Sequence, residues 1–188
     1  MESLIKSLNA LYPLSPPLEQ HLRAILQYDE WAAKKLLLRA GHVCERIGFI
    51  ESGLLRCYYK EGWQEVTAWF MKEGDTVISV KSFFRQCPGH EYIQALEPTA
   101  IWSITYQQLQ HCYQLYPEFN TIGRILTEQY YMLSEDRLYA MRRKRAADRF
   151  AFMQHHFPDL LTRVPVTAMA SYLGIAQETL SRVRSATL

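Results

Sequence analysis

The middle of the chain is a series of short apolar segments separated by polar turns, and this pattern constrains the fold more than any other feature. These segments span residues 47–59, 65–71, 76–80, 91–96 and 100–105. The first contains two apolar runs that meet at Ser52 and Gly53, and the second ends before a turn at 72–75. Many short strands at spacings of about 8 to 12 residues are typical of an antiparallel sandwich or jelly-roll barrel.

Helical patterns lie on both sides of the predicted strands. They span residues 3–27, 106–113, 117–141 and 146–156. The segment 117–141 carries a stripe with steps of three and four residues, formed by Phe119, Ile122, Leu126, Gln129, Leu133 and Ala140 and widened by Ile125 and Met132. This spacing suits a coiled-coil seam between two copies of the chain. The alternative is a single amphipathic helix that packs on its own barrel.

A helix, a tight turn and a second helix are predicted between Arg163 and Ser185. Pro165 and Thr167 mark the start of the first helix, since proline fits a first turn and threonine can cap free N–H groups. Gly174 can adopt the positive φ that ends a helix tightly. Ile175 follows as the expected buried hinge between the two helices.

The two helices divide into buried and exposed faces. The residues expected to face inward are Met169, Ala170 and Leu173 on the first helix and Leu180 and Val183 on the second. The residues expected to face outward on the second helix are Gln177, Glu178, Thr179, Ser181, Arg182 and Arg184. A small residue at Ala170 allows the close approach that a roughly perpendicular pair requires. The pair is either an ordinary helical hairpin or a DNA-binding helix-turn-helix.

Glu178 and Arg182 favour DNA binding. An arginine can donate a fork of hydrogen bonds to O6 and N7 of guanine, and a glutamate can accept from N4 of cytosine. Because the two residues are four apart, they share one face of the helix. The alternative is an ion pair between them, which would stabilise the helix by roughly a few tenths of a kcal/mol.

The positive charge of the chain is concentrated at its C-terminal end. The whole chain of 188 residues has a formal net charge of only +2. Residues 1–136 contain 12 Lys/Arg and 16 Asp/Glu, a formal charge of −4, whereas residues 137–188 contain 9 and 3, a formal charge of +6. Phosphate contact requires such a basic segment. The run Arg142, Arg143, Lys144 and Arg145 is either a solvated helix face or a surface that contacts phosphates.

Composition argues against a membrane protein. The apolar content of 48%, with 8 Gly and 8 Pro, is that of a globular chain. No apolar stretch approaches the roughly 20 residues that a membrane helix needs. Residues 1–14 show a short amphipathic helix pattern and not a signal segment. We therefore expect a cytoplasmic protein with no membrane partner.

The cysteine and histidine positions indicate neither a metal site nor a cofactor. Cys44, Cys57, Cys87 and Cys112 are scattered without a C-x-x-C pair, so neither a zinc knuckle nor a redox dithiol is expected. Metal-dependent catalysis on a barrel needs clustered histidine and carboxylate ligands, and the sequence has no H-x-H cluster. The chain is therefore not expected to be an enzyme.

Taken in order, these segments resemble the Crp/Fnr family of bacterial transcription regulators over essentially the whole chain. The resemblance is carried by F-I-E-S-G-L-L-R at 49–56, F-M-K-E-G-D at 70–75, the long helix, and A-x-x-L-G-I-A-x-E-T-L-S-R at 170–182. It implies an α+β fold, with an N-terminal antiparallel β-roll of the cyclic-nucleotide-binding type, jelly-roll-like and flanked by helices. A long dimerisation helix and a C-terminal, all-helical winged helix-turn-helix follow. The corresponding domains are 1–116, 117–141 and 142–188.

The resemblance also implies which residues contact DNA. The family's glutamate and arginine, which recognise a G·C-rich half-site element, fall on Glu178 and Arg182 in a recognition helix at about 176–187. The neighbouring variable contact falls on Gln177, and Thr179 and Ser181 are placed for phosphates. The expected protein is a homodimer that binds double-stranded DNA at a near-palindromic site. RNA polymerase and a small-molecule effector are further expected partners. The alternative is a ligand-binding or protein-interaction module of the same fold that no longer binds DNA.

Two departures from the family pattern affect the sensor and the wing. The glutamate that accepts from the ribose hydroxyl aligns with Ser79, and the Arg-Ser pair that holds the cyclic phosphate aligns with Gly89 and His90. Losing that arginine removes the group best suited to a buried phosphate, so we expect an effector other than cyclic AMP. Ser79, Arg85, Gly89 and His90 are the candidate effector pocket, although a surface loop is the commoner setting for a pair such as Arg85 and His90. Because the sequence ends at Leu188, any wing is expected between 157 and 165.

Overall fold

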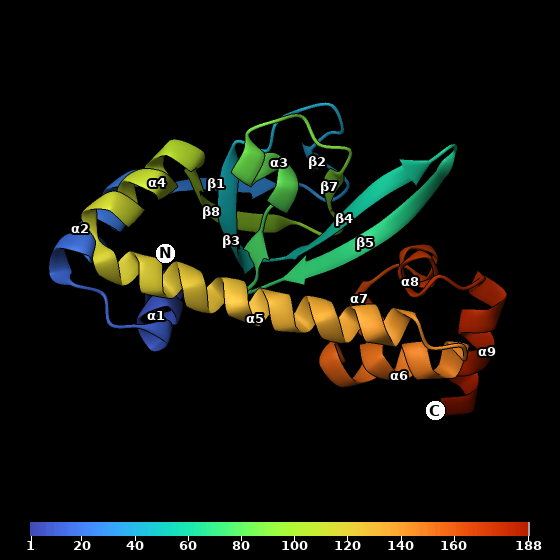
Figure 1. Ribbon diagram of the computed structural model, residues 1–188. Helices are drawn as coiled ribbons and strands as arrows, with labels where there is room; N and C mark the ends of the chain where they lie inside the picture. Colours follow the sequence, from blue (N-terminus) through green and yellow to red (C-terminus); the bar gives the residue numbers. More distant parts are fainter. Residues whose placement is uncertain (188) are drawn as a thin grey trace.

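The computed structural model describes residues 1–187, and its strands form two antiparallel four-stranded sheets with the orders β1-β8-β3-β6 and β2-β7-β4-β5 (Figure 1). The strands are β1 Gln27–Trp31, β2 Leu36–Leu38, β3 Arg46–Ser52, β4 Leu54–Glu61, β5 Gln64–Lys72, β6 Thr76–Val77, β7 Tyr92–Ala95 and β8 Thr99–Thr105. Apolar residues of both sheets, such as Ile50 and Leu55, share one buried core. The predicted antiparallel β-roll is therefore confirmed.

The turn at Gly53 carries the chain from one sheet to the other. The sequence predicts two strands that meet at this turn, but β3 and β4 belong to different sheets. Gly53 has φ of 103°, and a Cβ atom there would lie 2.6 Å from the carbonyl oxygen of Pro98. A residue with a side chain would therefore be strained at this crossing and would clash with the neighbouring loop.

Other strand predictions need correction. Strand β6 ends at Val77, and the predicted strand at 76–80 gives way to helix α3, Val80–Arg85. Strands β1 and β2 lie in segments that were not predicted as strands. Strand β1 carries mostly polar side chains and pairs with β8 at one edge of its sheet. It therefore lacks the alternating pattern on which the strand prediction depended.

The remaining helices lie close to their predicted positions. They are α1 Glu2–Leu11, α2 Pro16–Ile25, α4 Tyr106–Leu115, α5 Pro117–Met141, α6 Ala146–His156, α7 Leu160–Arg163, α8 Val166–Leu173 and α9 Gln177–Thr187. The helical pattern at 3–27 divides into two helices. The second begins at Pro16, and the hydroxyl of Ser15 caps it by accepting from the backbone N–H of Leu18 at 3.4 Å. Among these described helices, none is long and apolar enough to span a bilayer.

The predicted coiled-coil stripe on α5 divides between two environments. Phe119 and Ile122 are buried in the core of the β-roll, and Ala140 is buried near the other end. Gln129 is exposed, and Leu126 and Leu133 are half-buried. The buried residues therefore do not form a seam between copies, because they pack against the same chain.

The C-terminal helices enclose a second core. It includes residues of α6, α8 and α9 together with Leu54 and Phe70 of the β-roll. Met169, Ala170, Leu173 and Leu180 are buried as predicted, while Ile175 and Val183 are only partly buried. Figure 1 shows α6 alongside the last turns of α5, α9 beyond the end of α5, and α8 below the β4–β5 hairpin.

The helix pair α8–α9 differs in detail from its prediction. Gly174 adopts the left-handed conformation predicted for it, with φ of 62°. Pro165 occupies the N-cap and not the first turn, and the N-terminus of α8 has no side-chain cap, so the predicted role of Thr167 is wrong. Residues 157–165 contain α7, and no strand lies in that described stretch. The predicted wing is therefore absent from its expected place.

Polar contacts hold the C-terminal helices against the β-roll. The guanidinium of Arg163 donates to both carboxylate oxygens of Glu73, at 2.9 and 2.8 Å, and also to Glu97. Glu73 additionally accepts from the backbone N–H of Gly53 at 2.8 Å. Lys72 pairs with Asp159 at 3.3 Å. The two parts of the chain are therefore joined by a network of charges as well as by apolar packing.

Replacing Glu73 by Gln should weaken the fold at neutral pH but not in strong acid. The Arg163 guanidinium lowers the pKa of Glu73 from its ordinary value of 4.5 to about 2. A carboxyl whose pKa is lowered by folding stabilises the native state above its unfolded pKa, and this stabilisation is lost as the pH falls toward the folded pKa. Because the Glu73 side chain is 40% exposed, we expect Glu73→Gln to cost only about 0.5–1 kcal/mol at pH 7.

This cost should disappear between about pH 4.5 and pH 2. The free energy of unfolding of the wild type and of Glu73→Gln, determined with urea at neutral and at acidic pH, measures this cost. The control is Glu61→Gln, which removes an exposed carboxylate at the end of β4. An equal cost of Glu73→Gln at both pH values would contradict the view that pairing with Arg163 lowers the pKa of Glu73.

Candidate functional sites

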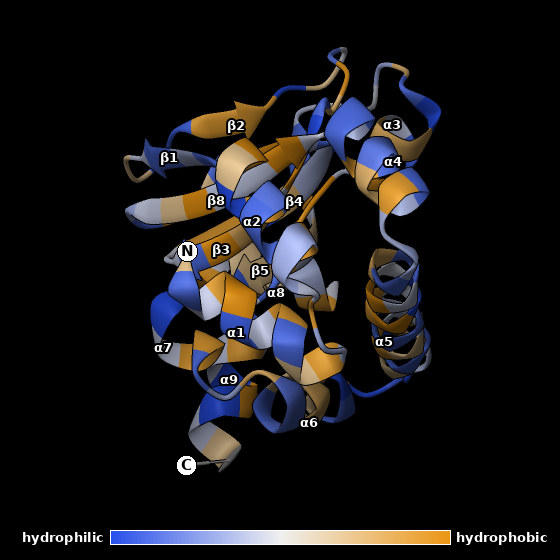
Figure 2. Ribbon diagram, turned by 90° about the vertical axis from the view of Figure 1, so that its left-hand side faces the viewer, coloured by the Kyte–Doolittle hydropathy of each residue, from blue (hydrophilic) through white to orange (hydrophobic). Residues whose placement is uncertain are grey.

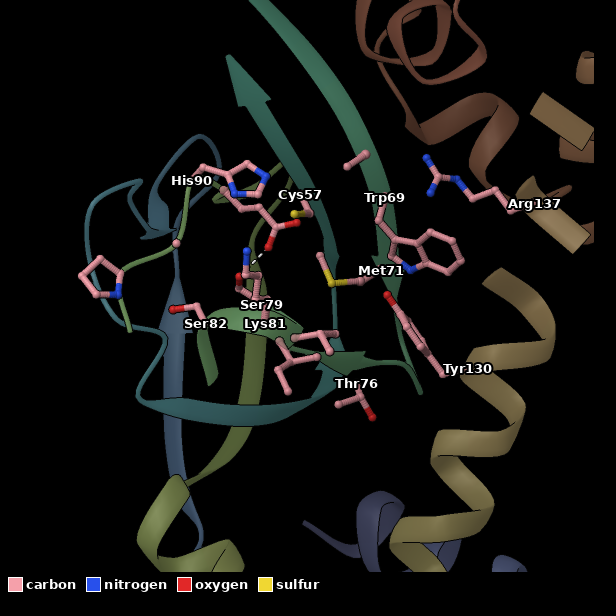
Figure 3. Close-up of a pocket in the computed structure, with 16 residues that line it drawn as sticks. Cys57, Trp69, Met71, Thr76, Ser79, Lys81, Ser82, His90, Tyr130 and Arg137 are labelled. Carbon is pink, nitrogen blue, oxygen red and sulfur yellow. Dashed lines mark hydrogen bonds between the residues drawn. The ribbon is translucent and has the colours of Figure 1, made fainter. Parts of the chain in front are cut away.

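A cavity of about 360 Å³ lies between the β-roll and the long helix α5 (Figure 3). One end is polar and is formed by α3 and the residues just before β7: Ser79, Lys81, Ser82, Gly89, His90 and Glu91. The other end is formed by β5 and α5 through Trp69, Met71, Tyr130 and Arg137. The cavity is therefore bounded by the strand that also supports the C-terminal helices.

A carboxylate occupies the polar end of the cavity. The buried hydroxyl of Ser79 donates a hydrogen bond to the Glu91 carboxylate. Burial and the neighbouring Glu91 carboxylate raise the pKa of the Cys57 thiol, which also lines the cavity. The Glu91 carboxylate disfavours a phosphate group beside it, and the ammonium of Lys81 is the one lysine charge that lines this described end of the cavity.

The structure brings together three of the four predicted pocket residues. Ser79, Gly89 and His90 line the cavity, whereas Arg85 is exposed at the end of α3 and is not among its lining residues. The backbone N–H of Gly89 donates to the carbonyl of His42 at 3.1 Å. This bond fixes the loop, and glycine leaves no side chain there to contact a ligand.

Sequence reasoning missed the residues that complete the cavity. Glu91 directly follows the aligned positions and carries a charge, so it could have been noticed from the family alignment. Trp69 and Arg137 are 68 residues apart in the sequence, and their proximity follows only from the packing of α5 on β5. The helical pattern of α5 by itself gave no reason to connect Arg137 with a pocket.

Arg137 connects the cavity to the C-terminal helices. The centre of its guanidinium lies 5.1 Å from the ring centroid of Trp69 and 4.8 Å from that of Tyr172 in α8. Contacts of this kind between a guanidinium and aromatic faces are attractive. The same side chain therefore touches the cavity wall and the helix that precedes α9.

Helix α8 is also bonded directly to strand β5. The hydroxyl of Ser171 accepts from the backbone N–H of Thr67 at 2.9 Å and donates to the carbonyl oxygen of Glu65 at 3.0 Å. Strand β5 is the last strand of its sheet, so these edge groups have no neighbouring strand to pair with. Ser171 supplies the missing partners and fixes the position of α8.

Helix α9 presents most of its polar side chains to solvent. Gln177, Glu178, Ser181 and Arg182 are exposed, and Thr179 is half-buried. The Nε of Arg182 donates to the backbone carbonyl of Glu178 at 3.3 Å. In the described part of the chain no ion pair joins the two side chains, so the carboxylate of Glu178 and the terminal nitrogens of Arg182 face solvent without pairing.

The basic run lies in a loop and not on a helix face. Arg142 caps the end of α5, and Arg143, Lys144 and Arg145 connect α5 to α6. All four side chains are exposed. Within residues 1–187, no group of three or more metal-ligating side chains was found.

The comparisons with known proteins agree with this arrangement. Residues 29–116 match the family model of the cyclic nucleotide-binding domain. The sequence matched no curated protein sequence. Among solved structures, FixK2 from Bradyrhizobium japonicum is 16% identical with a TM-score of 0.74, covering 86% of this chain and 83% of its own.

Two further structures match a larger share of the chain. The c-di-GMP responsive global regulator CLP from Xanthomonas campestris is 16% identical, with a TM-score of 0.70 over 92% of this chain and 91% of its own. A protein of the Crp/Fnr family from Eubacterium rectale is 15% identical, with a TM-score of 0.71 over 93% and 85%. Residues 29–116 are therefore similar to the cyclic nucleotide-binding domain, and the chain shares the overall fold of these three solved structures.

Proposed function

We propose that the chain is a DNA-binding transcription regulator of the Crp/Fnr type, with α9 as its recognition helix. The observation that carries this proposal is the exposed, unpaired polar face of α9 on the segment with a formal charge of +6. Nucleic-acid binding needs both a basic surface and side chains that can reach base edges. The fold of the chain is that of regulators, and we infer no catalytic activity.

The side chains of α9 suit direct recognition of bases in the major groove. The terminal guanidinium nitrogens of Arg182 suit O6 and N7 of guanine, and the Glu178 carboxylate suits N4 of cytosine. The bond from Arg182 Nε to the backbone of Glu178 orients the arginine and leaves its terminal nitrogens for a base. Gln177 supplies a variable base contact, and Thr179 and Ser181 contact phosphates. The basic loop at 142–145 adds phosphate contacts that are independent of sequence.

We infer a homodimer from an uncovered apolar surface on α5. Figure 2 shows hydrophobic residues along this helix among hydrophilic ones. Tyr131, Met132, Leu138 and Tyr139 have exposed fractions of 69%, 57%, 50% and 60%. They form two rows with seven-residue spacing, the repeat of a coiled coil. Of the residues predicted for the seam, only Met132 belongs to this surface. A two-fold dimer would place two recognition helices on half-sites about 34 Å apart.

The cavity is the proposed effector site, and its chemistry argues against cyclic AMP. Gly89 stands at the position that aligns with the arginine that holds the cyclic phosphate in cyclic-AMP binders of the family. Glu91 places a carboxylate at the polar end of the cavity. An effector of another class would act on the α8–α9 pair through β5 and Arg137. RNA polymerase as a further partner, and a cytoplasmic location, belong to the same proposal.

Replacing Arg182 by Ala should weaken binding to a selected operator by about 1–3 kcal/mol and relax one position of the site, because a bidentate base contact is lost. Fluorescence anisotropy with matched operators and single-base variants measures this effect. Arg85→Ala removes the same charge from an exposed side chain outside the proposed interface and serves as the control. Equal losses on matched and mismatched operators would refute direct base recognition by Arg182.

Replacing Leu138 by Glu should convert the dimer to a monomer, because it places a charge within the proposed apolar interface. Operator affinity should fall at least about tenfold, since joining two binding units raises affinity by about 10²–10⁴. Sedimentation velocity and anisotropy measure the two effects. The control is Leu115→Glu, which introduces the same charge on α4, at a side chain that is 51% exposed. A Leu138→Glu protein that remains dimeric would contradict this interface.

A further inference from the structure

Arg137 has an unsatisfied donor and a charge without a counterion. Its Nε atom is buried and has no hydrogen-bond partner. Within residues 1–187, no carboxylate lies within ion-pair distance of its guanidinium. A partly buried charge without a counterion is costly, and an anion that pairs with it removes much of that cost. Because Arg137 lines the cavity, a molecule bound there can supply that anion.

We propose that the cavity binds a small monocarboxylic acid whose carboxylate pairs with the guanidinium of Arg137. This inference rests on the proposed function, in which the cavity is the effector site. An arginine fork matches a carboxylate through two parallel hydrogen bonds. The position of Arg137 at one end of the cavity places the acid group of the ligand beside α5 and its remaining atoms toward α3 (Figure 3).

The other walls restrict the rest of the ligand. Trp69, Met71 and Tyr130 offer apolar and aromatic surface next to Arg137, which favours a hydrophobic or aromatic body. At the opposite end, the half-buried Glu91 carboxylate repels a second negative group placed beside it, whereas the Lys81 ammonium at that end is exposed to solvent, which screens its charge. The cavity volume of about 360 Å³ admits only a small molecule. These features together select a monoanion over a phosphate ester or a dicarboxylate.

Binding of such an acid would affect the proposed DNA-binding helices. The guanidinium of Arg137 contacts Tyr172, which directly follows Ser171, the residue that bonds α8 to β5. A carboxylate that draws Arg137 into the cavity weakens its contact with Tyr172. The position of α8, and with it that of α9, is thereby coupled to occupancy of the cavity.

The experiment compares benzoate with benzamide, which have the same ring and nearly the same size but differ in charge. Thermal unfolding of the full chain is followed with each compound at constant ionic strength, set with chloride. At a benzoate concentration of about ten times its Kd, the Tm of the wild type should rise by about 3–6 °C. Benzamide should have no effect. This measurement contains no DNA, so it tests the ligand proposal separately from DNA binding.

Variants identify the group that binds benzoate. Arg137→Met should abolish the rise in Tm, and Arg137→Lys, which keeps the charge but loses the fork, should retain a smaller one. The control is Arg124→Met, which removes an exposed arginine of α5 that pairs with Glu128 outside the cavity. The control should respond as the wild type does. No response of the wild type to benzoate, an equal response to benzamide, or a full response in both Arg137 variants would overturn the proposal.

Hydrogen exchange tests the coupling to α8. The amide of Thr67 donates to Ser171, so benzoate should increase exchange at Thr67 and within α8 in the wild type but not in Arg137→Met. Benzoate that raises the Tm without changing this exchange would overturn the coupling and leave the binding site in place. Failure of the protein to bind DNA would contradict the proposed function and would not affect either result.

Discussion

Strand β5 is the element on which both proposed functions depend, because it lines the cavity and also bonds to α8, the helix that precedes the proposed recognition helix. Trp69 and Met71 of this strand line the cavity, and the Thr67 amide at its edge bonds to Ser171 of α8. An edge strand has free backbone groups that must find partners, and here a serine side chain from a distant helix supplies them. A shift of β5 in response to a ligand would therefore also move α8.

Arg137 and Arg163 reinforce this connection in different ways. Arg163 pairs with Glu73 and Glu97 in the turns of the β-roll, so it holds the two parts together with charges that remain accessible to solvent. Arg137 is packed between the rings of Trp69 and Tyr172, so its position depends on what the cavity contains. Arg163 thus stabilises the packing of the C-terminal helices against the β-roll, whereas Arg137 links this packing to the proposed effector.

Local features of the fold could be predicted from the sequence. Pro117 at the start of α5 and Gly174 at the end of α8 are residues whose backbone preferences determine helix ends, and the structure places both where they were expected. Periodicity could not decide what the stripe on α5 would face. Phe119 and Ile122 pack on the chain's own core, whereas Met132 is exposed, although all three belong to the predicted stripe.

Contacts between distant segments were not predictable. Glu91 and Arg137 meet around one cavity, and Ser171 meets β5 across more than 100 residues, because tertiary packing brings these segments together. Three of the predicted pocket residues, Ser79, Gly89 and His90, came from the resemblance to the family, and all three line the cavity. Arg85 was added for its charge alone, and it is not among the lining residues.

The most direct test of DNA binding is the affinity of the purified full chain for random duplex DNA at increasing salt concentration. A chain whose basic segment contacts several phosphates should bind at low salt, and its affinity should fall steeply, with a slope of about −0.9 in log K against log salt for each phosphate neutralised. The absence of binding at low salt, or an affinity that does not depend on salt, would contradict the account. It would favour a sensor of the same fold that does not act on DNA.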